Sequence, residues 1–322
     1  MTTKRKNVLV FRELPPDQLI RLQAEHAVTV ADPRVQDQVA AFTAALPAAQ
    51  GLIGSSVRID EAVLAQAPRI EVVSSISVGV DNYDLPALRR RGILLCNTPG
   101  VLTETTADTI FALMLATSRR LVELALHVRE GRWTRNIGES MFGWDVHAKT
   151  LGILGFGRIG QALARRAALG FGMQVLYHNP SAVDLPELGA RARRVPLDAL
   201  LGQSDFVAAT LPLTDETRGL MGAAEFAAMK RGAIFVNGSR GAIVQEDALL
   251  ATLDSGHLRA AGLDVFAVEP LPLDSPLRTH ARVTALPHIG SATHETRYAM
   301  AELATTNLLQ GLAGQRPGTV VD

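Results

Sequence analysis

The chain has 322 residues, enough for two domains or one large one. Hydrophobic residues make up 47% of the sequence and charged residues 20%, a balance typical of a globular protein and not of a disordered one. The 32 Lys and Arg residues balance the 32 Asp and Glu residues, so no basic excess points to a nucleic-acid partner. The single cysteine, Cys96, excludes an intrachain disulfide and a multi-cysteine metal site.

The sequence also argues against a membrane protein. No run of about 18 uncharged apolar residues occurs, which is the length that a membrane-spanning helix needs. The first apolar run is short and ends before Arg12 and Glu13, which indicates an opening strand and not a signal peptide. We therefore expect a cytoplasmic protein with no membrane and no nucleic-acid partner.

Short apolar runs alternate with helical patterns along the first hundred residues. Strands are expected at 8–11, 51–54, 71–75 and 92–96. Residues 17–25 have helical spacing, and Asp60 can cap a further helix that carries Ala62 to Ala67. Strands separated by helices of this length predict a parallel sheet with helices on its faces.

A long helix is expected to start near Thr103, which can serve as its cap. Apolar residues continue at helical spacing from Ile110 to Val128, too densely for one helix face. This helix should pack against more than its own sheet, either by crossing between domains or by joining a second subunit.

A second alternating series follows from Thr150. Strands are expected at 151–154, 174–177, 206–209, 233–237, 261–263 and 283–285, with helices between the earlier ones. A last helix follows Ser291. The sequence therefore predicts an α/β protein built on parallel sheets.

A glycine motif links the first strand of the second series to a helix. Gly155 suits a tight turn, Gly157 allows the backbone to approach a pyrophosphate, and Gly160 allows the helix to pack close to the strand. This strand–turn–helix context predicts nucleotide binding, with a purely structural turn as the alternative. The motif reads Gly155, Phe156, Gly157, Arg158, Ile159, Gly160.

The end of the next strand bears on the choice of cofactor. NAD enzymes of this fold place an acid about 20 residues after the glycines, on the adenine ribose. Here Asn179 takes that place, followed by Ser181, and neither residue would repel a 2′-phosphate. We expect NADP(H) to be favoured over NAD(H). An arginine, the usual positive partner of the 2′-phosphate, is missing next to Asn179. Further along the chain, Arg191, Arg193 or Arg194 either supplies this partner or forms a solvated charge run.

Three polar residues stand where expected strands end. Arg240 can bind a carboxylate at two points, His288 can donate a proton near neutral pH, and Glu269 can hold the imidazole and favour its charged form. Each alone has an ordinary alternative: a surface arginine, a turn at Glu269-Pro270, or a buried structural histidine. Because ligands bind beyond the carboxyl ends of parallel strands, their shared placement predicts one catalytic site.

With these motifs the sequence resembles the D-isomer-specific 2-hydroxyacid dehydrogenases along nearly its whole length. Within that family it is most similar to the bacterial glyoxylate/hydroxypyruvate reductases that also act as 2-ketogluconate reductases. The resemblance rests on the glycine motif, on 236–241, on 262–266 with Glu269-Pro270, and on 287–290. The closer match rests on 75–79, 101–105 and 287–298.

The resemblance implies two Rossmann-like domains, each a mostly parallel sheet with helices on both faces. Residues 1–101 with 290–322 would form a flavodoxin-like substrate domain, and 102–289 the dinucleotide-binding domain. It also implies a homodimer joined largely through the cofactor domain.

The resemblance further implies an NAD(P)H-dependent reductase of small 2-keto acids, such as glyoxylate, hydroxypyruvate and 2-ketogluconate, that forms D-2-hydroxy acids with His288 as acid and base. Arg240, Glu269 and His288 match the catalytic positions. Val78 and Gly79 match the loop whose N–H groups take the substrate carboxylate. Cofactor positions are matched by Asp264 near the nicotinamide and by Leu211, Pro212 and Thr217 along the adenosine half.

Two other functions share parts of this pattern. Phosphite dehydrogenases use the same Arg–Glu–His set, and some relatives are nucleotide-sensing corepressors that act as binding proteins. Formate dehydrogenases carry glutamine where Glu269 stands, which argues against formate. Trp144 is expected either to line the substrate entrance, in this or a neighbouring subunit, or to anchor a dimer interface.

Overall fold

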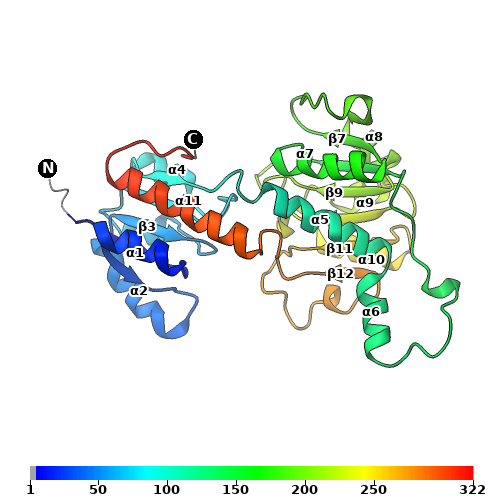
Figure 1. Cartoon of the computed structure of the whole chain (residues 1–322), viewed down its shortest axis with the longest axis horizontal. Helices are drawn as coiled ribbons and strands as arrows, with labels where there is room; N and C mark the ends of the chain where they lie inside the picture. Colours follow the sequence, from blue (N-terminus) through cyan, green and yellow to red (C-terminus); the bar gives the residue numbers. More distant parts are fainter. Residues whose placement is uncertain (1–4, 322) are drawn as a thin grey trace. The chain divides into compact units, whose positions relative to one another are not determined.

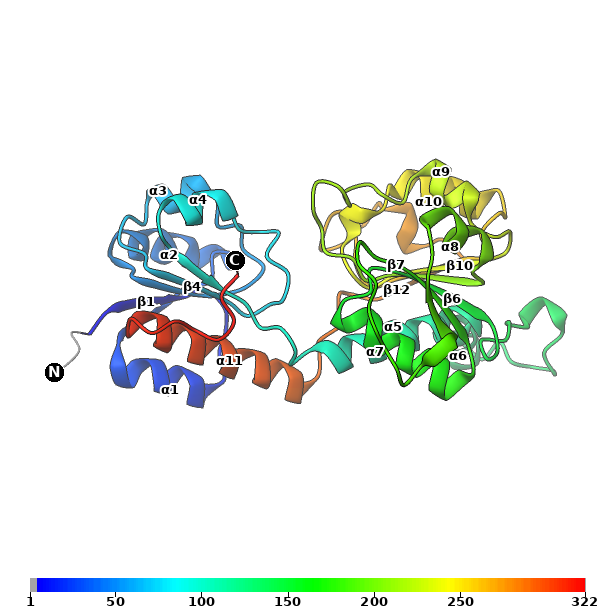
Figure 2. The ribbon, with the colours of Figure 1, turned by 90° about the horizontal axis from the view of Figure 1, so that it is seen from above.

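The computed structural model describes residues 5–321, which form two compact units. Of the described residues, unit 1 comprises those up to Leu102 and those from Ala292 onward, and unit 2 comprises Thr103–Ser291. Each unit is a parallel sheet covered by helices on both faces (Figures 1 and 2). The predicted fold class, two Rossmann-like α/β domains, is confirmed.

Unit 1 is built on a five-stranded sheet with the order β2-β1-β3-β4-β5, in which every neighbouring pair is parallel. This is the flavodoxin-like strand order. The strands are short, and β3 and β4 are fully buried, as expected for a parallel sheet covered on both faces. They are β1 Asn7–Val10, β2 Ala27–Val30, β3 Gly51–Gly54, β4 Val72–Ser75 and β5 Leu94–Cys96.

Helices cover both faces of this sheet (Figure 2). On the first face lie α1 Pro16–Glu25 and α11 His294–Leu312, and on the second α2 Val39–Ala45, α3 Glu61–Ala65 and α4 Leu85–Arg90. The Ser74 hydroxyl donates a 2.7 Å hydrogen bond to the Ala304 carbonyl, which ties the end of the chain to the buried strand β4. Asp60 caps α3 as predicted, because its carboxylate accepts the N–H groups of Ala62 and Val63.

Strand β2 was missed by the sequence analysis. It lies at the edge of the sheet, and most of its side chains are exposed, so it lacks the buried apolar run that marks the other strands. Cys96, at the end of β5, is fully buried. Burial raises the pKa of its thiol to about 11, so it is an inert core residue at neutral pH.

Unit 2 is built on a seven-stranded parallel sheet with the order β12-β11-β10-β9-β6-β7-β8. Counted from β6, this is the Rossmann order with a seventh strand added at one edge. Its topological switch point lies between β6 and β9. The strands are β6 Thr150–Leu154, β7 Gln174–His178, β8 Ala192–Arg194, β9 Phe206–Ala209, β10 Ile234–Asn237, β11 Ala260–Leu263 and β12 Val283–Ala285.

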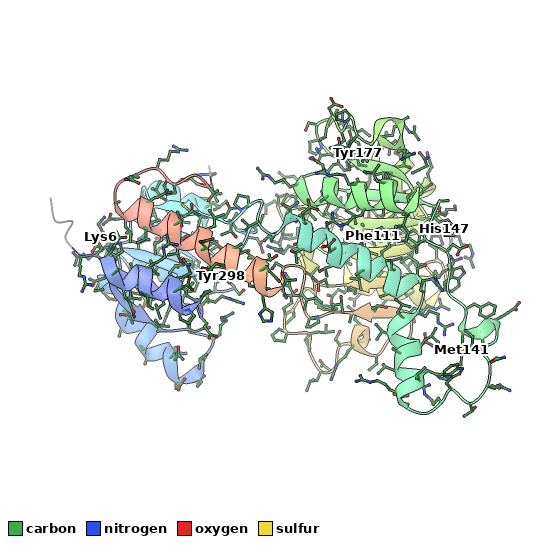
Figure 3. The ribbon with its side chains drawn as sticks, in the orientation of Figure 1. Lys6, Phe111, Met141, His147, Tyr177 and Tyr298 are labelled. Atoms are coloured by element: carbon green, nitrogen blue, oxygen red, sulfur yellow. The ribbon has the colours of Figure 1, made fainter. Side chains whose placement is uncertain are left out.

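Helices cover both faces of this sheet too, with an apolar core on each face. The first face carries α5 Thr103–Ser118 and α7 Arg158–Arg165, and the second α8 Leu197–Gln203, α9 Ala223–Ala228 and α10 Glu246–Asp254 (Figure 2). α6 Leu121–Arg129 follows α5 and extends beyond this face (Figure 1). Phe111, labelled on α5 in Figure 3, packs edge-on against Phe171 with ring centroids 4.7 Å apart. No helix in the described part of the chain is long and apolar enough to cross a membrane.

The prediction of a single long helix after Thr103 is wrong, because the segment forms two helices, α5 and α6. Arg120 adopts a left-handed backbone conformation (φ 55°) and ends the first helical run. Its guanidinium binds Glu123 and the Ser140 carbonyl, which stabilises the break. Thr103 is the first residue of α5 and not a residue ahead of it. α5 buries its apolar residues against the sheet, whereas α6 buries none.

Candidate active site

The glycine motif follows β6 and opens α7, at the switch point of the seven-stranded sheet. Gly155 has φ +85°, which an ordinary side chain would strain. A Cβ added to Gly160 would lie 2.4 Å from the Gly155 carbonyl, so this glycine lets the helix pack against the turn. A Cβ added to Gly157 would meet no atom within 4 Å. The open space beside the free N–H groups at the start of α7 fits the pyrophosphate of a dinucleotide.

Some of the other residues of the motif and of the adenosine loop pack in the core, and others are exposed to solvent. The Phe156 ring is buried and stacks on Tyr177 at 3.9 Å, so it belongs to the core (Figure 3 labels Tyr177). Arg158 is exposed and Ile159 half-buried at the first turn of α7. Leu211 packs against Gly155. In the loop that follows, the Thr217 hydroxyl donates a 2.7 Å hydrogen bond to the Pro212 carbonyl.

Asn179 lies at the end of β7 and joins it to the glycine loop. Its amide oxygen accepts the Phe156 N–H at 3.0 Å, and its amide nitrogen donates to the carbonyl of Ser181, which is exposed. The arginine that the sequence lacks beside Asn179 comes from the edge strand β8. Arg194 donates hydrogen bonds to the Asn179 carbonyl (2.8 Å) and the Pro180 carbonyl (2.6 Å). The later arginine run is therefore partly a strand, and one member lies against this loop.

Arg240, Glu269 and His288 follow three neighbouring strands. β10 pairs with β11, and β11 with β12, so their carboxyl ends meet at one edge of the sheet. Nδ1 of His288 donates a 2.7 Å hydrogen bond to Oε2 of Glu269. The other carboxylate oxygen accepts the Phe266 N–H at 3.0 Å, which fixes the orientation of the carboxylate. The three predicted residues therefore share one edge of one sheet.

The turn that carries Arg240 is organised by a residue that the sequence analysis did not single out. Asn237 is buried at the end of β10, and its side chain accepts two hydrogen bonds from Ser239 and donates one to the Arg240 carbonyl. A Cβ at Gly241 would lie 1.8 Å from the Phe266 carbonyl carbon, so this turn and the Glu269 loop are in close contact. Asn237 had a signal in the sequence: it is a polar residue at the end of a buried strand.

Neighbouring charges and hydrogen bonds set the pKa of Glu269. Burial would raise the pKa of the Glu269 carboxyl, but the hydrogen bonds from His288 and the Phe266 N–H, and the charges of His288 and Arg240, lower it below its usual value. Glu269 is therefore ionised at neutral pH. It presents a fixed negative charge to the imidazole of His288.

Asp264 holds the loop that bears His288. It is buried after β11, and its carboxylate accepts the N–H groups of Ile289 (2.7 Å) and Gly290 (2.8 Å). Burial raises the pKa of Asp264, while these two hydrogen bonds and the charge of His288 oppose the rise. His288 has φ 55°, a conformation that costs a non-glycine residue energy. The Asp264 bonds offset part of that cost. The resemblance did not imply this positioning role.

Val78 and Gly79 belong to unit 1, in the loop after β4. The Asn97 amide donates a 2.9 Å hydrogen bond to the Val78 carbonyl, which orients the loop. Within residues 5–321 neither the Val78 N–H nor the Gly79 N–H donates a hydrogen bond. Both are half-buried and available to an anion.

Trp144 lies in unit 2, after α6. Its N–H and carbonyl both bond Ser118, and the Arg259 guanidinium lies 4.2 Å from the centre of its ring. Part of the ring remains exposed. Its two expected roles, at a substrate entrance or in a dimer interface, stay predictions.

Comparison with known proteins assigns the family. Residues 111–290 match the family model described as "D-isomer specific 2-hydroxyacid dehydrogenase, NAD binding domain". The chain belongs to this family. The matched segment lies within unit 2 and contains the glycine loop, Arg240, Glu269 and His288.

Close relatives carry more specific names. The dehydrogenase is 51% identical over 314 residues to glyoxylate/hydroxypyruvate reductase B of Escherichia coli, with 97% of this chain and 96% of the relative covered. It is 50% identical to the Citrobacter koseri protein of the same name, with the same coverage. Among solved structures, a Thermus thermophilus protein is 44% identical, with a TM-score of 0.90 over 98% of this chain and all of that one. An NADPH-dependent glyoxylate/hydroxypyruvate reductase of Sinorhizobium meliloti, solved with NADP and malonate, is 31% identical, with a TM-score of 0.89 over 99% and 97%.

Two alanine substitutions should separate cofactor binding from folding. Gly157→Ala adds a methyl group to open space, so stability should not change while the equilibrium affinity for the dinucleotide falls at least about tenfold. Gly160→Ala presses a methyl group onto a backbone carbonyl that cannot move aside, so it should lower the free energy of unfolding by about 1–3 kcal/mol. Fluorescence titration and urea unfolding measure the two effects. Equal cofactor affinity in Gly157→Ala and the parent would contradict the role of this glycine.

Proposed function

We propose that this dehydrogenase reduces small 2-keto acids, among them glyoxylate, hydroxypyruvate and 2-ketogluconate, to D-2-hydroxy acids with NADPH as the favoured cofactor. The observation that carries the proposal is the 2.7 Å hydrogen bond between His288 and Glu269 at the strand edge shared with Arg240. The names of the relatives that match nearly the whole chain support the substrate class.

His288 supplies the proton. Its Nδ1 is held by Glu269, which leaves Nε2 as the nitrogen available to a substrate. When bound, the nicotinamide supplies hydride to the keto carbon. The imidazolium of His288 gives its Nε2 proton to the keto oxygen as negative charge develops there. Glu269 stabilises the charged imidazole before the transfer and keeps the ring oriented.

The substrate carboxylate is bound by a cation. The Arg240 guanidinium presents two parallel N–H groups that match the two oxygens of a carboxylate. In unit 1, the N–H groups of Val78 and Gly79 are a separate set of donors available to an anion. Fixing the carboxylate orients the neighbouring carbonyl, which lowers the entropic part of the barrier.

The test of this assignment is His288→Ala. Loss of the proton donor should reduce kcat for glyoxylate at least about a hundredfold, because general acid catalysis contributes on the order of 10²–10⁴-fold. Affinity for NADPH, measured by fluorescence titration, should stay near that of the parent. Turnover close to the parent's would show that His288 is not the proton donor. Parallel assays with phosphite as the hydride donor would detect phosphite dehydrogenase activity, the alternative that shares the Arg–Glu–His set.

A second variant tests the pairing of His288 with Glu269. Glu269→Gln keeps the size of the side chain but removes the negative charge that stabilises the imidazolium. Since the imidazolium is the active form in reduction, the rate should begin to fall at a lower pH than in the parent. Initial rates of glyoxylate reduction between pH 5 and 9 measure this shift. A pH profile that coincides with the parent's would argue that Glu269 does not act through His288.

The preference for NADPH rests on charge at the end of β7. Asn179 and Ser181 carry no negative charge, and Arg194 brings a guanidinium within hydrogen-bond distance of the same loop. A 2′-phosphate carries negative charge that a nearby arginine attracts and an aspartate in the place of Asn179 would repel. The solved Sinorhizobium meliloti relative is named as NADPH-dependent, which supports this preference.

Arg194→Gln should therefore change cofactor choice. The ratio of kcat/KM for NADPH to that for NADH should fall about tenfold or more, since a charge-assisted hydrogen bond contributes roughly 1.5–3 kcal/mol. Arg193→Gln is the matched control, because neighbouring residues of a strand point to opposite faces. An unchanged ratio in Arg194→Gln, or an equal fall in both variants, would contradict the role of Arg194.

The proposal includes a homodimer joined through unit 2. The arm formed by α6 and the following loop extends from the body of this unit (Figure 2; Met141 marks the loop in Figure 3). No residue of α6 is buried, and an exposed apolar cluster of this extent is typical of a surface that associates. The arm's exposed apolar side chains are Leu121, Val122, Leu126, Val128, Trp133, Ile137 and Phe142.

Charge placed on α6 should break this association. In sedimentation equilibrium the parent should have twice the chain mass of 34.4 kDa, and the double variant Val122→Glu, Leu126→Glu should have the mass of one chain. Since neither side chain is buried, the fold of the unit should persist. Leu169→Glu, another exposed apolar position of unit 2, is the control and should leave the dimer intact. An undisturbed dimer in the double variant would place the interface elsewhere.

A further inference from the structure

The end of the chain, red in Figure 2, returns to the edge of the five-stranded sheet in unit 1. Cys96, the last residue of β5, forms an antiparallel bridge with Val320. The Asn97 N–H donates a 3.1 Å hydrogen bond to the Thr319 carbonyl. Because β5 is an edge strand, this segment covers backbone groups that would otherwise be open to another chain. The cover uses backbone bonds, so the Thr319 side chain is not needed for it.

Two side chains near this end of the chain hold the Asn97 carbonyl. The Thr319 hydroxyl donates to it at 2.7 Å, and the side-chain amide of Asn307 donates to it at 3.2 Å. The same amide donates to the Thr319 hydroxyl at 2.8 Å, which leaves the hydroxyl proton for Asn97. Asn307 is fully buried on α11, so it fixes the hydroxyl from within the core. The peptide group between Asn97 and Thr98 is therefore held from the end of the chain.

The other side of the same peptide group holds the loop after β4. The Thr98 N–H belongs to the peptide group of the Asn97 carbonyl, and it donates to the Ser77 carbonyl at 3.0 Å. The Asn97 side chain donates to the next carbonyl of the loop, that of Val78, at 2.9 Å. Asn97 and Thr98 thus bind two consecutive carbonyls of the loop.

These two hydrogen bonds set the direction of the donors that the loop offers. In a trans peptide group, such as these, the C=O and the N–H point in opposite directions. The Ser77 carbonyl shares its peptide group with the Val78 N–H, and the Val78 carbonyl shares the next one with the Gly79 N–H. Because both carbonyls are bound by the Asn97–Thr98 segment, both N–H groups point away from that segment. Two successive N–H groups with one direction form a site suited to an anion.

We propose that Thr319 is a positioning residue for the anion site formed by the Val78 and Gly79 N–H groups, with Asn307 fixing its hydroxyl. Thr319 touches neither N–H group. It acts through the Asn97 carbonyl, whose peptide group and side chain hold the loop. The inference rests on the proposed function, because the anion in question is the carboxylate of the 2-keto acid. It gives the end of the chain a role in substrate binding.

Oxalate binding tests the inference without turnover. Oxalate carries carboxylates but no keto group, and it is titrated calorimetrically into the protein with saturating NADP⁺. Thr319→Val keeps the shape of the side chain but removes the donor, so the Kd for oxalate should rise about threefold or more. Thr319→Ser keeps the hydroxyl and should bind like the parent. Thr306→Val is the matched control on α11: it removes a 3.3 Å hydrogen bond with Arg21, and oxalate binding should not change.

A double-mutant cycle shows whether Thr319 acts through Asn97. Asn97→Ala removes the donor to the Val78 carbonyl and should itself raise the Kd for oxalate. In the double variant Asn97→Ala, Thr319→Val the Kd should rise by less than the product of the two single effects, because both changes release the same loop. Effects that multiply would contradict the inference. It would also be overturned by unchanged oxalate binding in Thr319→Val, by an equal loss in Thr306→Val, or by no oxalate binding in the parent.

Steady-state kinetics separate a failure of this inference from a failure of the proposed function. In Thr319→Val the KM for glyoxylate should rise about threefold or more while kcat stays within about twofold, because proton and hydride transfer use none of these residues. A fall in kcat with an unchanged KM would indicate a general structural role and would contradict the inference. If the parent reduces no 2-keto acid, the proposed function fails, and the oxalate titrations still decide whether Thr319 positions the site.

Discussion

The parallel pairing of β10, β11 and β12 is the constraint on which the site depends. The register places Asn237, Leu263 and Ala285, the last residues of the three strands, side by side. The turns that follow the strands therefore start at the same level of the sheet. Arg240, Glu269 and His288, separated by up to 48 positions of chain, arrive at one edge for that reason. A slip of one residue in either pairing would reverse the faces of a strand and separate the groups.

Buried polar side chains convert this coarse alignment into a defined geometry. Asn237 shapes the turn of Arg240, the Phe266 N–H orients Glu269, and Asp264 holds the backbone after His288. Each of these bonds satisfies a polar group that would otherwise be costly to bury. The same contacts therefore stabilise the domain and preorganise the residues that the proposed reaction uses.

The two units show different uses of the same sheet edge. In unit 2 the edge carries the His288–Glu269 pair and Arg240, and the glycine loop follows β6 of the same sheet, a set suited to proton transfer. In unit 1 the edge carries the loop of Val78 and Gly79 after β4, whose backbone N–H groups are available to an anion. Parallel sheets make both possible because every strand delivers its carboxyl end, and the loop after it, to the same side.

The sequence by itself determined the α/β class, the glycine loop and the three polar residues at strand ends, because these depend on local periodicity and on motifs of adjacent residues. It failed where the signal was not local. β2 and β8 lie at sheet edges, and their exposed side chains lack a buried pattern. The break at Arg120 depends on a left-handed residue held by Glu123 and Ser140, which apolar spacing does not encode. The approach of Arg194 to Asn179 required the order of the strands, since only the packed sheet brings such distant positions together.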